Sequence, residues 1–598
     1  MANGMDRIQV RQIHQVLLGC GFRYTNARDI SPDSALRLLY SAAGFYVKSY
    51  VTSAGTFDVA IVLKDELLTT LPAAIILQSP EQLKGRLLPH INMGWYLCYV
   101  EEKEATWDPN DLEGLLRSVD IQIGLTLNNS VNAVETGLAV DAEMEGEFSS
   151  YWLARHTAYL VADVTQEKEF NCFVAGKKNA HKTEYQEWVV CDDTTLEERD
   201  AWLSQRKLEL HDSRGIITRR IRIKPSQLSG VTWPPKTFRA VLDWLAEVDN
   251  VAWLHLLEHF IQHPVKRHMI LMDVIHQDMV GFRVDLDLGA LALSSYQSSS
   301  VRRQRKAGRV NYAHLASAVS SKQAVQKFQR VNVVQADRLS VLSRNRRGKE
   351  SGDLSTKHIA LIGCGTIGGY LAGLLLRAGA GCGDKTFHLF DHDEFQPINF
   401  GRHVLATTDI GRNKAEALVF TLNSSTHLAK NIKAFTSRFA INAEQLKRYD
   451  IVIDATGRPP VSARLASVVR TLKLTERPVL IHGFNDGNGR ASKVIIDDGS
   501  CCYGCLFANE AFYKGGMDLR FNHISMSAER HISCGSTFTP YDAAVSIITA
   551  GIMQEAALSV LEKNARWTYS EHMLEGGRTQ KQKLLAAHPR CGICHGNL

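Results

Sequence analysis

The stretch HIALIGCGTIGGYLAGLLLRAGAG, residues 358–381, decides the fold of the C-terminal half of the chain. Ile359 to Ile362 is a short, β-branched and apolar run, which predicts a strand buried on both faces, as in a parallel sheet. The glycines Gly363, Gly365 and Gly368 then form the pattern GxGxxG. The first permits a tight turn, the second lets the backbone approach a phosphate, and the third lets a helix pack on the strand. The stretch therefore predicts strand, phosphate-binding turn and helix, with an anion held by the amides at the helix start.

More than one nucleotide fits such a turn, because GxGxxG occurs in sites for NAD, FAD and ATP. A glycine turn that binds no nucleotide is a further alternative. A second expected strand, Thr386 to Phe390, ends in Asp391. An acidic residue at that strand end is placed to accept a hydrogen bond from a ribose hydroxyl. A dehydrogenase has the same features up to this point.

The residues after this strand distinguish between the nucleotide sites. The segments HDEFQPINFGR (392–402) and GRNKAEAL (411–418) resemble the ThiF/MoeB and ubiquitin-activating enzyme superfamily, whose signature is Asp-x-Asp, then Asn and Arg, then a Lys that opens a helix. The matching residues here are Asp391, Asp393, Asn399, Arg402 and Lys414. Two fixed cations suit the neutralisation of a triphosphate and a departing pyrophosphate, which hydride transfer does not need. Each charge taken singly also fits a solvated surface, so it is their order that favours ATP.

The resemblance implies two further residues of the ATP site. In RYDIVIDATG (448–457), Asp454 ends an apolar strand where the superfamily carries acidic residues near Mg2+ and the substrate carboxylate. The second Asp that the family often has three positions later is Gly457 here, and a helix-capping Asp is the alternative. An arginine from just before the glycine turn reaches the ATP of the paired subunit in this superfamily, which implies a homodimer. Arg344 is the candidate, with other arginines close enough to take its place: Arg338, Arg346 and Arg347.

Two CxxC pairs predict a metal site. CCYGCLF (501–507) supplies Cys502 and Cys505, and RCGICHG (590–596) supplies Cys591 and Cys594. Four thiolates close a tetrahedral Zn2+ site, which is structural because no coordination position stays open. The ThiF/MoeB group holds its C-terminal region in this way, and the first pair resembles that group closely. Two disulfides or unrelated thiols are the alternatives.

A further cysteine, Cys534, lies between these pairs in a polar loop before an apolar helix that is expected to start near Pro540. The position resembles the one at which thioester-forming activating enzymes hold their nucleophile. A thiol at a helix N-terminus and near a cation such as Arg530 is expected to have a lowered pKa and to be reactive. A buried cysteine that acts as a small hydrophobe is the alternative.

The N-terminal residues 1–160 predict a separate α/β domain, with a helix over Arg7 to Leu18 and strands in FYVKSYVTSAGTFDVAIVL (45–63) and AAIILQ (73–78). The segment PHINMGWYLCYVEEKEATWDP (89–109) then resembles the core of ubiquitin-conjugating enzymes, where His-Pro-Asn precedes the catalytic Cys and Trp-x-Pro follows. The matching positions are His90, Ile91, Asn92, Cys98, Trp107 and Pro109, with Ile91 in place of the proline.

This second resemblance implies a role for each matching residue. Cys98 as a thiolate would accept an acyl group as a thioester, and Asn92 would stabilise the oxyanion when an amine attacks it. His90 is expected to hold the loop by hydrogen bonds rather than to act as a base. A plain core cysteine is the alternative for Cys98. Closing helices are expected over Leu112 to Leu116 and Glu147 to Tyr159.

The length and composition of the chain limit the number of domains and the class of protein. The 598 residues predict three or four domains, and 45% hydrophobic and 22% charged residues are typical of a soluble globular protein. The net charge of +6 gives no reason to expect direct nucleic-acid binding, and we expect no signal peptide and no membrane span. Twelve cysteines, some in CxxC pairs, favour metal and thiol chemistry in a reducing cytoplasm. Residues 161–335 predict a mixed α/β linker domain, and residues 336–598 a Rossmann-like adenylation domain.

A conjugating-like domain ahead of an activating domain is similar to the fused enzymes of bacterial type II CBASS antiphage operons. This resemblance implies an α/β multidomain enzyme that uses ATP, Mg2+ and a structural Zn2+. Its cargo would be the C-terminus of a cGAS/DncV-like nucleotidyltransferase, which passes from Cys534 to Cys98 and then to a lysine-bearing acceptor. Three alternatives stay open: a MoeB/ThiF-like adenylating enzyme for a sulfur carrier or ubiquitin-like protein, a nicotinamide oxidoreductase, and an inactive scaffold.

Overall fold

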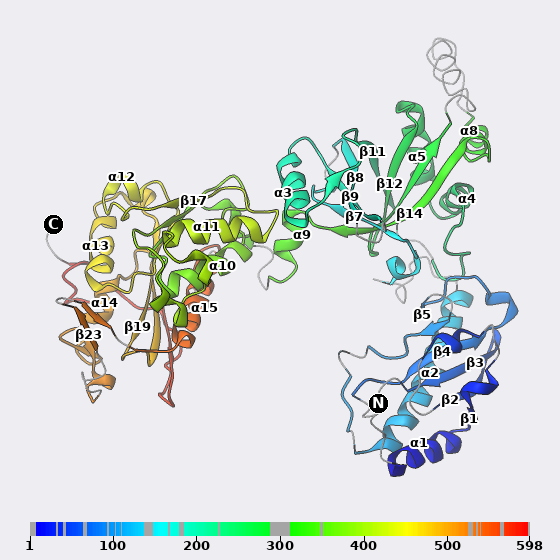
Figure 1. Cartoon of the computed structure of the whole chain (residues 1–598), viewed down its shortest axis with the longest axis horizontal. Helices are drawn as coiled ribbons and strands as arrows, with labels where there is room; N and C mark the ends of the chain where they lie inside the picture. Colours follow the sequence, from blue (N-terminus) through cyan, green and yellow to red (C-terminus); the bar gives the residue numbers. More distant parts are fainter. Residues whose placement is uncertain are drawn as a thin grey trace, which may run out of the picture. The chain divides into compact units, whose positions relative to one another are not determined.

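A computed structural model gives the structure of the chain (Figure 1). It describes residues 7–30, 34–39, 44–63, 69–92, 95–101, 103, 105–108, 110–136, 147–165, 168–178, 184–224, 228–287, 311–346, 351–523, 530–533, 536–538, 540–562 and 567–595. The chain forms two compact units. The first contains residues 1–160, 164–193 and 209–334, and the second contains residues 161–163, 194–208 and 335–598. None of the helices in the described ranges combines the length and the apolar character needed to cross a bilayer.

The N-terminal part of the first unit is an antiparallel sheet with strand order β1-β2-β3-β4-β6-β5 and two helices that share its core. β2 and β3 pair along their whole length, with Thr52 opposite Gly55 at the tight turn. Ile13 of the first helix, Ile61 of β3 and Ile123 of the second helix are all fully buried in this core. The expected helix and strands are therefore confirmed. The elements are α1 (Arg7–Gly19), β1 (Arg23–Thr25), β2 (Phe45–Thr52), β3 (Gly55–Val62), β4 (Ala73–Gln78), β5 (Ile91–Asn92), β6 (Tyr96–Leu97) and α2 (Leu112–Thr136).

The rest of the first unit is built on a second sheet, with strand order β10-β8-β11-β12-β13-β14-β7-β9. β8 also pairs with β9, so the strands from β8 to β9 form a closed ring. The elements are β7 (His156–Leu160), β8 (Phe170–Lys178), β9 (Glu184–Cys191), β10 (Glu209–Leu210), β11 (Ile216–Ile223), α4 (Phe238–Val248), α5 (Asn250–Gln262), β12 (Arg267–Val274), β13 (Val280–Leu286), α8 (Tyr312–Val319) and β14 (Val325–Gln335). This mixed α/β linker confirms the fold expected for the middle of the chain.

The prediction of a closing helix over Glu147 to Tyr159 is wrong. A single 3-10 turn, η5 (Phe148–Tyr151), is followed by β7, which belongs to the linker's sheet. Phe148, Tyr151 and Trp152 have helical spacing, but they are buried in the linker's core together with Phe238 and Phe282. Packing against that core, rather than helical periodicity, decides the conformation of this segment.

The second unit contains a seven-stranded sheet with order β17-β16-β15-β18-β19-β20-β25, in which β15 to β19 are parallel. Its strands are β15 (Ile359–Ile362), β16 (Phe387–Phe390), β17 (Ile432–Phe435), β18 (Ile451–Asp454), β19 (Val479–Asp486), β20 (Ala491–Asp497) and β25 (Tyr569–Met573). Its helices are α9 (Arg338–Ser343), α10 (Thr366–Arg377), α11 (Lys414–Ser425), α12 (Ala443–Leu446), α13 (Pro459–Val469), α14 (Tyr503–Phe507) and α15 (Ala543–Ser559), and α3 (Leu196–Arg206) packs on this unit through Trp202 and His427.

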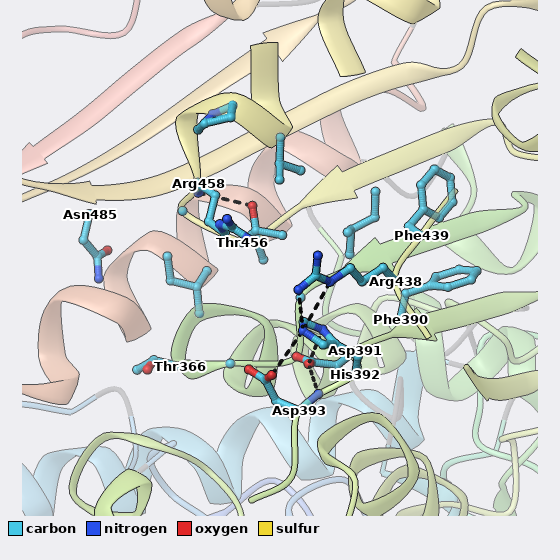
Figure 2. A pocket seen from close by; sticks show the side chains of 18 of the residues that line it. Thr366, Phe390, Asp391, His392, Asp393, Arg438, Phe439, Thr456, Arg458 and Asn485 are labelled. Atoms are coloured by element: carbon cyan, nitrogen blue, oxygen red, sulfur yellow. Dashed lines mark hydrogen bonds and ion pairs between the residues drawn. The ribbon is translucent and has the colours of Figure 1, made fainter. Parts of the chain in front are cut away.

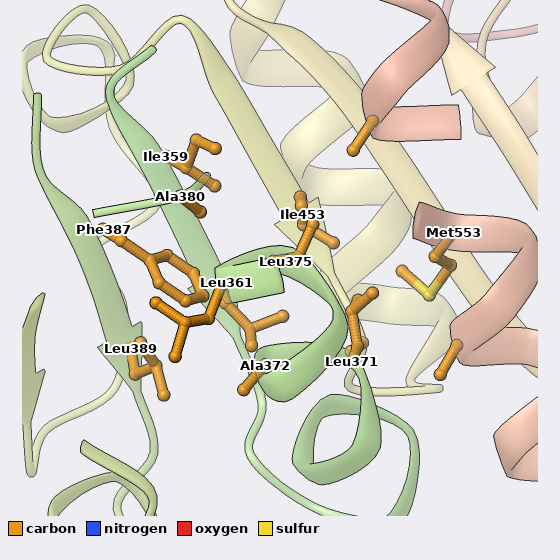
Figure 3. Packing of buried hydrophobic residues seen from close by; sticks show 14 of the residues in the cluster. Ile359, Leu361, Leu371, Ala372, Leu375, Ala380, Phe387, Leu389, Ile453 and Met553 are labelled. Atoms are coloured by element: carbon orange, nitrogen blue, oxygen red, sulfur yellow. The ribbon is translucent and has the colours of Figure 1, made fainter. Parts of the chain in front are cut away.

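The core of the second unit lies between this sheet and α10 and α15. Figure 3 shows Leu371 and Leu375 of α10 beside Leu361 and Ile453 of the sheet, and Met553 of α15 belongs to the same cluster of buried side chains. β15 is completely buried, as its continuous apolar run predicts. The chain runs from β15 outward through β16 and β17 and then returns to β18 on the other side of β15. Ligands bind in parallel α/β sheets at such a reversal of strand order, which here lies beside the glycine turn.

Short elements complete the second unit: the hairpins β21 (Tyr513–Lys514) with β22 (Met517–Asp518) and β23 (Arg530–Ser533) with β24 (Ser536–Phe538), and the 3-10 turns η8 (Pro397–Arg402) and η9 (Thr407–Asp409).

Candidate active sites

The glycine turn has the geometry that its pattern predicts. Gly363 has φ +89°, in the region that favours glycine. A Cβ on Gly368 would lie 1.9 Å from the carbonyl oxygen of Gly363, so only glycine fits where α10 meets the turn. Gly365 is the N-cap of α10 and makes no side-chain cap bond, and a Cβ there would meet nothing within 4 Å. The first amides of α10 therefore face open space without a capping side chain, which suits a phosphate group.

Asp391 lies beside this turn, at the end of β16 (Figure 2). Its Oδ2 accepts a hydrogen bond of 2.7 Å from the Cys364 amide, and its Oδ1 accepts one of 2.9 Å from the Asp393 amide. The carboxylate is buried apart from its cavity side. Its remaining lone pairs are placed to accept hydrogen bonds from a sugar.

A cavity of about 810 Å³ opens over the turn. Among the predicted residues, Gly363, Gly365, Asp391 and Asp393 line it. Side chains that the sequence analysis did not select also line it: Thr366, His392, Arg438, Phe439, Arg458, Arg464, Asp486 and Tyr541. Figure 2 shows Arg438 directed toward His392, whose Nε2 accepts bonds of 3.3 Å from the Nε and Nη2 of Arg438. The only available signal was the position of Arg438, three residues beyond a parallel strand that ends at the same edge of the sheet.

Three predicted residues stand around the cavity without lining it. Lys414 begins α11 and is buried, with its Nζ 3.4 Å from Oδ2 of Asp393. The guanidinium of Arg402 lies 4.4 Å from the ring centre of Tyr541, which lines the cavity. The side-chain oxygen of Asn399 accepts a 3.0 Å bond from the Gln396 amide and so shapes η8. The roles assigned to these residues in nucleotide binding stay predictions.

Asp454 lies at the end of β18, as expected, but it faces the protein interior. Its Oδ1 accepts bonds from Thr456, and its Oδ2 accepts bonds from Ser462 at 2.5 Å and from Nδ1 of His482 at 3.0 Å. Burial opposes ionisation of this carboxyl, yet these hydrogen bonds hold its pKa below the ordinary value. Asp454 does not line the cavity. Its position therefore gives no support to the predicted contact with Mg2+.

Arg344 is exposed at the end of α9, with Leu342 of the same helix packed in the main core. Leu342, Asn345 and Arg346 line a second cavity together with Leu376 and Arg377, at the C-terminal end of α10. The glycine turn is at the other end of α10, which spans about 18 Å for its 12 residues. Arg344 is therefore remote from the glycine turn of its own subunit.

The two CxxC pairs come together at one point. The four Sγ atoms lie 3.4–3.7 Å apart across the Cys502–Cys505, Cys502–Cys591, Cys505–Cys594 and Cys502–Cys594 contacts. Zn–S bonds of about 2.3 Å in a tetrahedron separate the sulfur atoms by about 3.8 Å, so the cluster fits a zinc ion. The His588 amide also points to the Sγ of Cys505, at 3.3 Å. The cluster ties α14 to the C-terminal segment.

Cys534 lies outside the described residues. The strands on either side of it, β23 and β24, pair with each other, and α15 begins at Ala543. Its predicted role as a nucleophile stays a prediction.

The Cys98 loop is described apart from Met93 and Gly94. Cys98 is partly buried, and its amide donates a 2.8 Å bond to the carbonyl oxygen of His90. Burial first, and then the charges of Glu147 and Glu101, raise the pKa of the Cys98 thiol above its ordinary value. Asn92 ends β5, and in the described part of the chain its side-chain oxygen is buried without a hydrogen-bond partner.

His90 holds this loop, as predicted for a structural histidine. Its Nδ1 lies 3.0 Å from Oε1 of Glu147, and its backbone amide donates a 3.0 Å bond to Oε2 of the same carboxylate. Trp107 packs against the core of the N-terminal domain, and Pro109 lies outside the described residues. The loop therefore brings Asn92, His90 and Cys98 into one short segment, and Glu147 is a contact that the sequence analysis missed.

Comparisons with known protein families match both the N-terminal and the C-terminal domain of the chain. The model of prokaryotic E2 family B matches residues 20–161, and the model of the ThiF family matches residues 342–592. Two relatives, from Vibrio cholerae serotype O1 and from Escherichia coli strain TW11681, are 47% and 44% identical to this chain, and each alignment covers 98% of this chain and 99% of the relative. A relative from Pseudomonas aeruginosa is 27% identical over 83% of both chains.

All three relatives carry the name ATP-dependent ubiquitin transferase-like protein Cap2. The near-complete coverage at more than 40% identity includes the Cys98 loop, the linker and the nucleotide turn in a single alignment. The chain therefore belongs to the Cap2 family of ATP-dependent ubiquitin transferase-like proteins, with an N-terminal E2-like domain and a C-terminal ThiF-type adenylation domain.

Proposed function

We propose that this protein activates the C-terminal carboxylate of a partner protein with ATP and conjugates it to a lysine through two successive thioesters. The observation that carries the proposal is that one chain holds both a nucleotide turn with a fixed acidic residue, Asp391, and a separate loop in which Cys98 follows Asn92. An adenylating enzyme that only charges a carrier does not need the second site. A nicotinamide enzyme needs neither the cation at the start of α11 nor the cysteine cluster.

Adenylation is the first step. The triphosphate lies over the uncapped amides at the start of α10, and the ribose donates to Asp391. The partner's carboxylate attacks the α-phosphorus and pyrophosphate leaves, which gives an acyl-adenylate. Arg438 in the cavity, with Lys414 and Arg402 beside it, offsets the charge on the phosphates. Mg2+ would be held by carboxylates on the cavity side of the turn, such as Asp393, rather than by Asp454.

The acyl group then passes through two thiols. The Cys534 thiolate attacks the acyl carbonyl and AMP leaves. The Cys98 thiolate next attacks the thioester, and the Cys534 thiol is released. A lysine amine of the acceptor attacks the Cys98 thioester to form an isopeptide bond, and the Asn92 amide stabilises the oxyanion in this step. A structural Zn2+ would be held by Cys502, Cys505, Cys591 and Cys594; it would supply no chemistry to these steps and would hold α14 against the C-terminal segment.

A homodimer is part of the proposal. Arg344 is remote from its own glycine turn, so it would serve the ATP site only of a second copy. Ile398 and Phe400 of η8 are 77% and 60% exposed, and Ile547 of the adjacent α15 is 46% exposed. Exposed apolar side chains grouped near a site are typical of an interaction face. We assign this face to the second copy.

The cargo that we propose is the C-terminus of a cGAS/DncV-like nucleotidyltransferase, in the cytoplasm and as part of CBASS antiphage signalling. This assignment rests on the resemblance of the fused architecture to type II CBASS enzymes and on the Cap2 relatives. No membrane and no nucleic acid is needed for any step.

The test is ATP–pyrophosphate exchange by the full chain with and without a nucleotidyltransferase that carries an intact C-terminus. We expect exchange only when the intact C-terminus is present. Truncation of the last residues of that partner is the matched control and should abolish exchange. Exchange with an unrelated small carrier protein alone would overturn the cargo assignment, and no exchange with any protein carboxylate would overturn the adenylation step.

Replacement of the two cysteines separates the later steps. Cys98→Ala should keep the thioester on Cys534 and abolish the isopeptide product, whereas Cys534→Ala should abolish both. Persistence of the isopeptide product in Cys98→Ala would remove Cys98 from the proposed relay.

A further inference from the structure

Within the residues that the structure describes, the carboxylate of Glu147 holds the Cys98 loop through His90. Both backbone and side chain of His90 contact this carboxylate, at 3.0 Å each. The hydroxyl of Tyr151 donates a further bond of 3.1 Å to its Oε2. Burial opposes the ionisation of Glu147, but these hydrogen bonds outweigh it and keep its pKa below the ordinary value, so the group is a carboxylate at neutral pH.

Glu147 acts on Cys98 through the backbone of His90. His90 has φ +63°, a conformation that a non-glycine residue adopts only when its surroundings impose it. The two contacts to Glu147 supply that constraint. In this conformation the carbonyl oxygen of His90 accepts the 2.8 Å bond from the Cys98 amide. The position of the Cys98 backbone therefore depends on Glu147 through two consecutive hydrogen bonds.

The turn that follows Glu147 is anchored in the linker. The residues that follow it, Phe148, Tyr151 and Trp152, are buried in the core of the linker. The Phe148 ring lies 4.5 Å from that of Trp233, centre to centre. Nε1 of Trp152 donates to carbonyl oxygens of β13 and β14, at 2.8 and 3.1 Å. The carboxylate that holds the Cys98 loop is thus placed by the packing of another domain.

The linker also holds the chain just before the loop. The Leu87 amide donates a 2.8 Å bond to Val231, and the Gly230 amide donates a 2.7 Å bond to Leu87. Nη1 of Arg86 donates a third bond, of 2.8 Å, to the carbonyl oxygen of Gly230. The Leu87 side chain is 3% exposed and belongs to the linker's core. The segment that leads into His90 is therefore fixed by the linker from a second direction.

We propose that the linker domain completes the conjugating site, with Glu147 as the positioning residue that holds the His90 turn and thereby sets the place of Cys98 relative to Asn92. The role of Cys98 as an acyl acceptor rests on the function proposed above, but the dependence of the loop on Glu147 does not. The linker would then be a required part of the conjugating site rather than a spacer between two enzymes.

The position of Glu147 also affects the ionisation of the Cys98 thiol. The negative charge of Glu147, together with burial and the charge of Glu101, makes the Cys98 thiol harder to ionise. A contact selected for thiol reactivity would carry a cation at this place. The loop has a carboxylate instead, which is consistent with a role in geometry and distinguishes that role from activation of the thiol.

The test compares the full-length variants Glu147→Ala, Glu147→Gln and Ser149→Ala. Glutamine keeps one oxygen that can accept the His90 amide but removes the charge. Ser149→Ala is the matched control, because Ser149 lies in the same turn and its hydroxyl bonds to Asp278 of the linker at 3.2 Å without touching the loop. The first readout is backbone hydrogen exchange of residues 88–98, and the second is the rate at which a preformed Cys98 thioester is discharged to a free amine.

In Glu147→Ala, we expect the His90 and Cys98 amides to exchange about tenfold faster or more, because the partly buried hydrogen bond that holds the His90 backbone is lost. Amine discharge should fall by a similar factor, with ATP–pyrophosphate exchange unchanged. Glu147→Gln should retain most of the protection and of the discharge rate, while the pH midpoint for alkylation of Cys98 moves to a lower pH. Ser149→Ala should match the parent protein in all three measurements.

Unchanged hydrogen exchange of residues 88–98 in Glu147→Ala would overturn the proposal, as would equal loss of protection in Ser149→Ala. If the parent protein forms no thioester on Cys98, the proposed function fails. Hydrogen exchange and the alkylation profile would still decide whether Glu147 positions the loop.

Discussion

The backbone amide of Cys364 donates a 2.7 Å hydrogen bond to the carboxylate of Asp391. The first residue of the nucleotide turn after Gly363 is thereby joined to the end of the neighbouring strand. The second carboxylate oxygen accepts the amide of Asp393 over 2.9 Å. The carboxylate of Asp391 thus fixes the conformation of the turn, and its remaining lone pairs can accept hydrogen bonds from a ligand.

This double role predicts that Asp391→Ala lowers both stability and adenylation. Two amides lose their acceptor, which costs about 1–3 kcal/mol for each bond that is not replaced by water. We expect a lower unfolding temperature and a loss of ATP–pyrophosphate exchange of at least about a hundredfold. Asp384→Ala removes an exposed carboxylate of the same domain and is the control. Exchange within about threefold of the parent rate in Asp391→Ala would contradict the assignment.

Replacement by alanine should lower the stability of the protein at Gly368 but not at Gly365, where it should instead weaken ATP binding. In Gly368→Ala, the new Cβ would meet the Gly363 carbonyl at 1.9 Å, so we expect destabilisation of about 1–3 kcal/mol or more. In Gly365→Ala, the Cβ meets no atom within 4 Å and φ is −74°, so the unfolding temperature should not change. The methyl group occupies the space where a phosphate approaches, and ATP affinity should fall about tenfold. Thermal unfolding and calorimetric ATP titration of both variants decide this, and equal stability of the two variants would contradict it.

The cysteine cluster predicts one zinc ion in each chain. Cys591→Ser or treatment with a strong chelator should remove the metal and lower the unfolding temperature, because α14 and the C-terminal segment lose their common anchor. Elemental analysis and thermal unfolding measure the two effects. Cys501→Ser is the control: its thiol points to the carbonyl oxygen of Ile496, 3.5 Å away, so its metal content should be that of the parent protein. A parent protein without zinc, at unchanged stability after chelation, would refute the site.

A buried histidine pair predicts a loss of linker stability in mild acid. Nδ1 of His268 lies 3.2 Å from Nε2 of His259, and both residues are almost fully buried. Burial first, and then the neighbouring histidines, lower the pKa of His259 to about 3 and that of His268 to about 4. The unfolded chain has ordinary histidines with a pKa of about 6.5, so it binds protons more readily than the folded chain below this pH.

Stability of the linker should therefore be constant above about pH 7 and fall as the pH drops from about 6.5 toward 4. Denaturant unfolding at pH 7.5 and pH 5, followed by hydrogen exchange in β12 and α5, measures the change. His268→Gln should weaken the pH dependence, because one of the two buried imidazoles that must bind a proton on unfolding is removed. A midpoint that does not depend on pH would show that these groups do not titrate on unfolding.

Several features of the fold were predictable because they depend on neighbouring residues. The run from Ile359 to Ile362 is long enough for one buried strand only, and the glycines after it leave few alternatives to a tight turn and a helix start. The CxxC spacing brings the two thiols of each pair close together, at the start of the short helix α14 for Cys502 and Cys505 and in a turn for Cys591 and Cys594. The helix opened by Lys414 was also expected and is confirmed as α11.

Other features depend on partners that are distant in the chain. Asp454 ends its strand as predicted, but Ser462 and His482 occupy its Oδ2 and direct it away from the cavity. A closing helix was expected over Glu147 to Tyr159, but Phe148, Tyr151 and Trp152 are buried in the linker's core, and the segment forms a 3-10 turn and a strand instead. Arg438 belongs to the cavity only because β17 ends at the same edge of the sheet as β15 and β16.

The sequence by itself determined the order of the domains, the nucleotide turn, the cysteine pairs and the Asn92 to Cys98 segment, since each depends on residue type and short spacing. Tertiary structure decided which charges face the nucleotide cavity and which residue holds the Cys98 loop. Glu147 is 57 residues from His90 in the chain and meets it only because the linker's core fixes the turn that follows it. The free energy of such contacts comes from packing between distant segments, which no local pattern records.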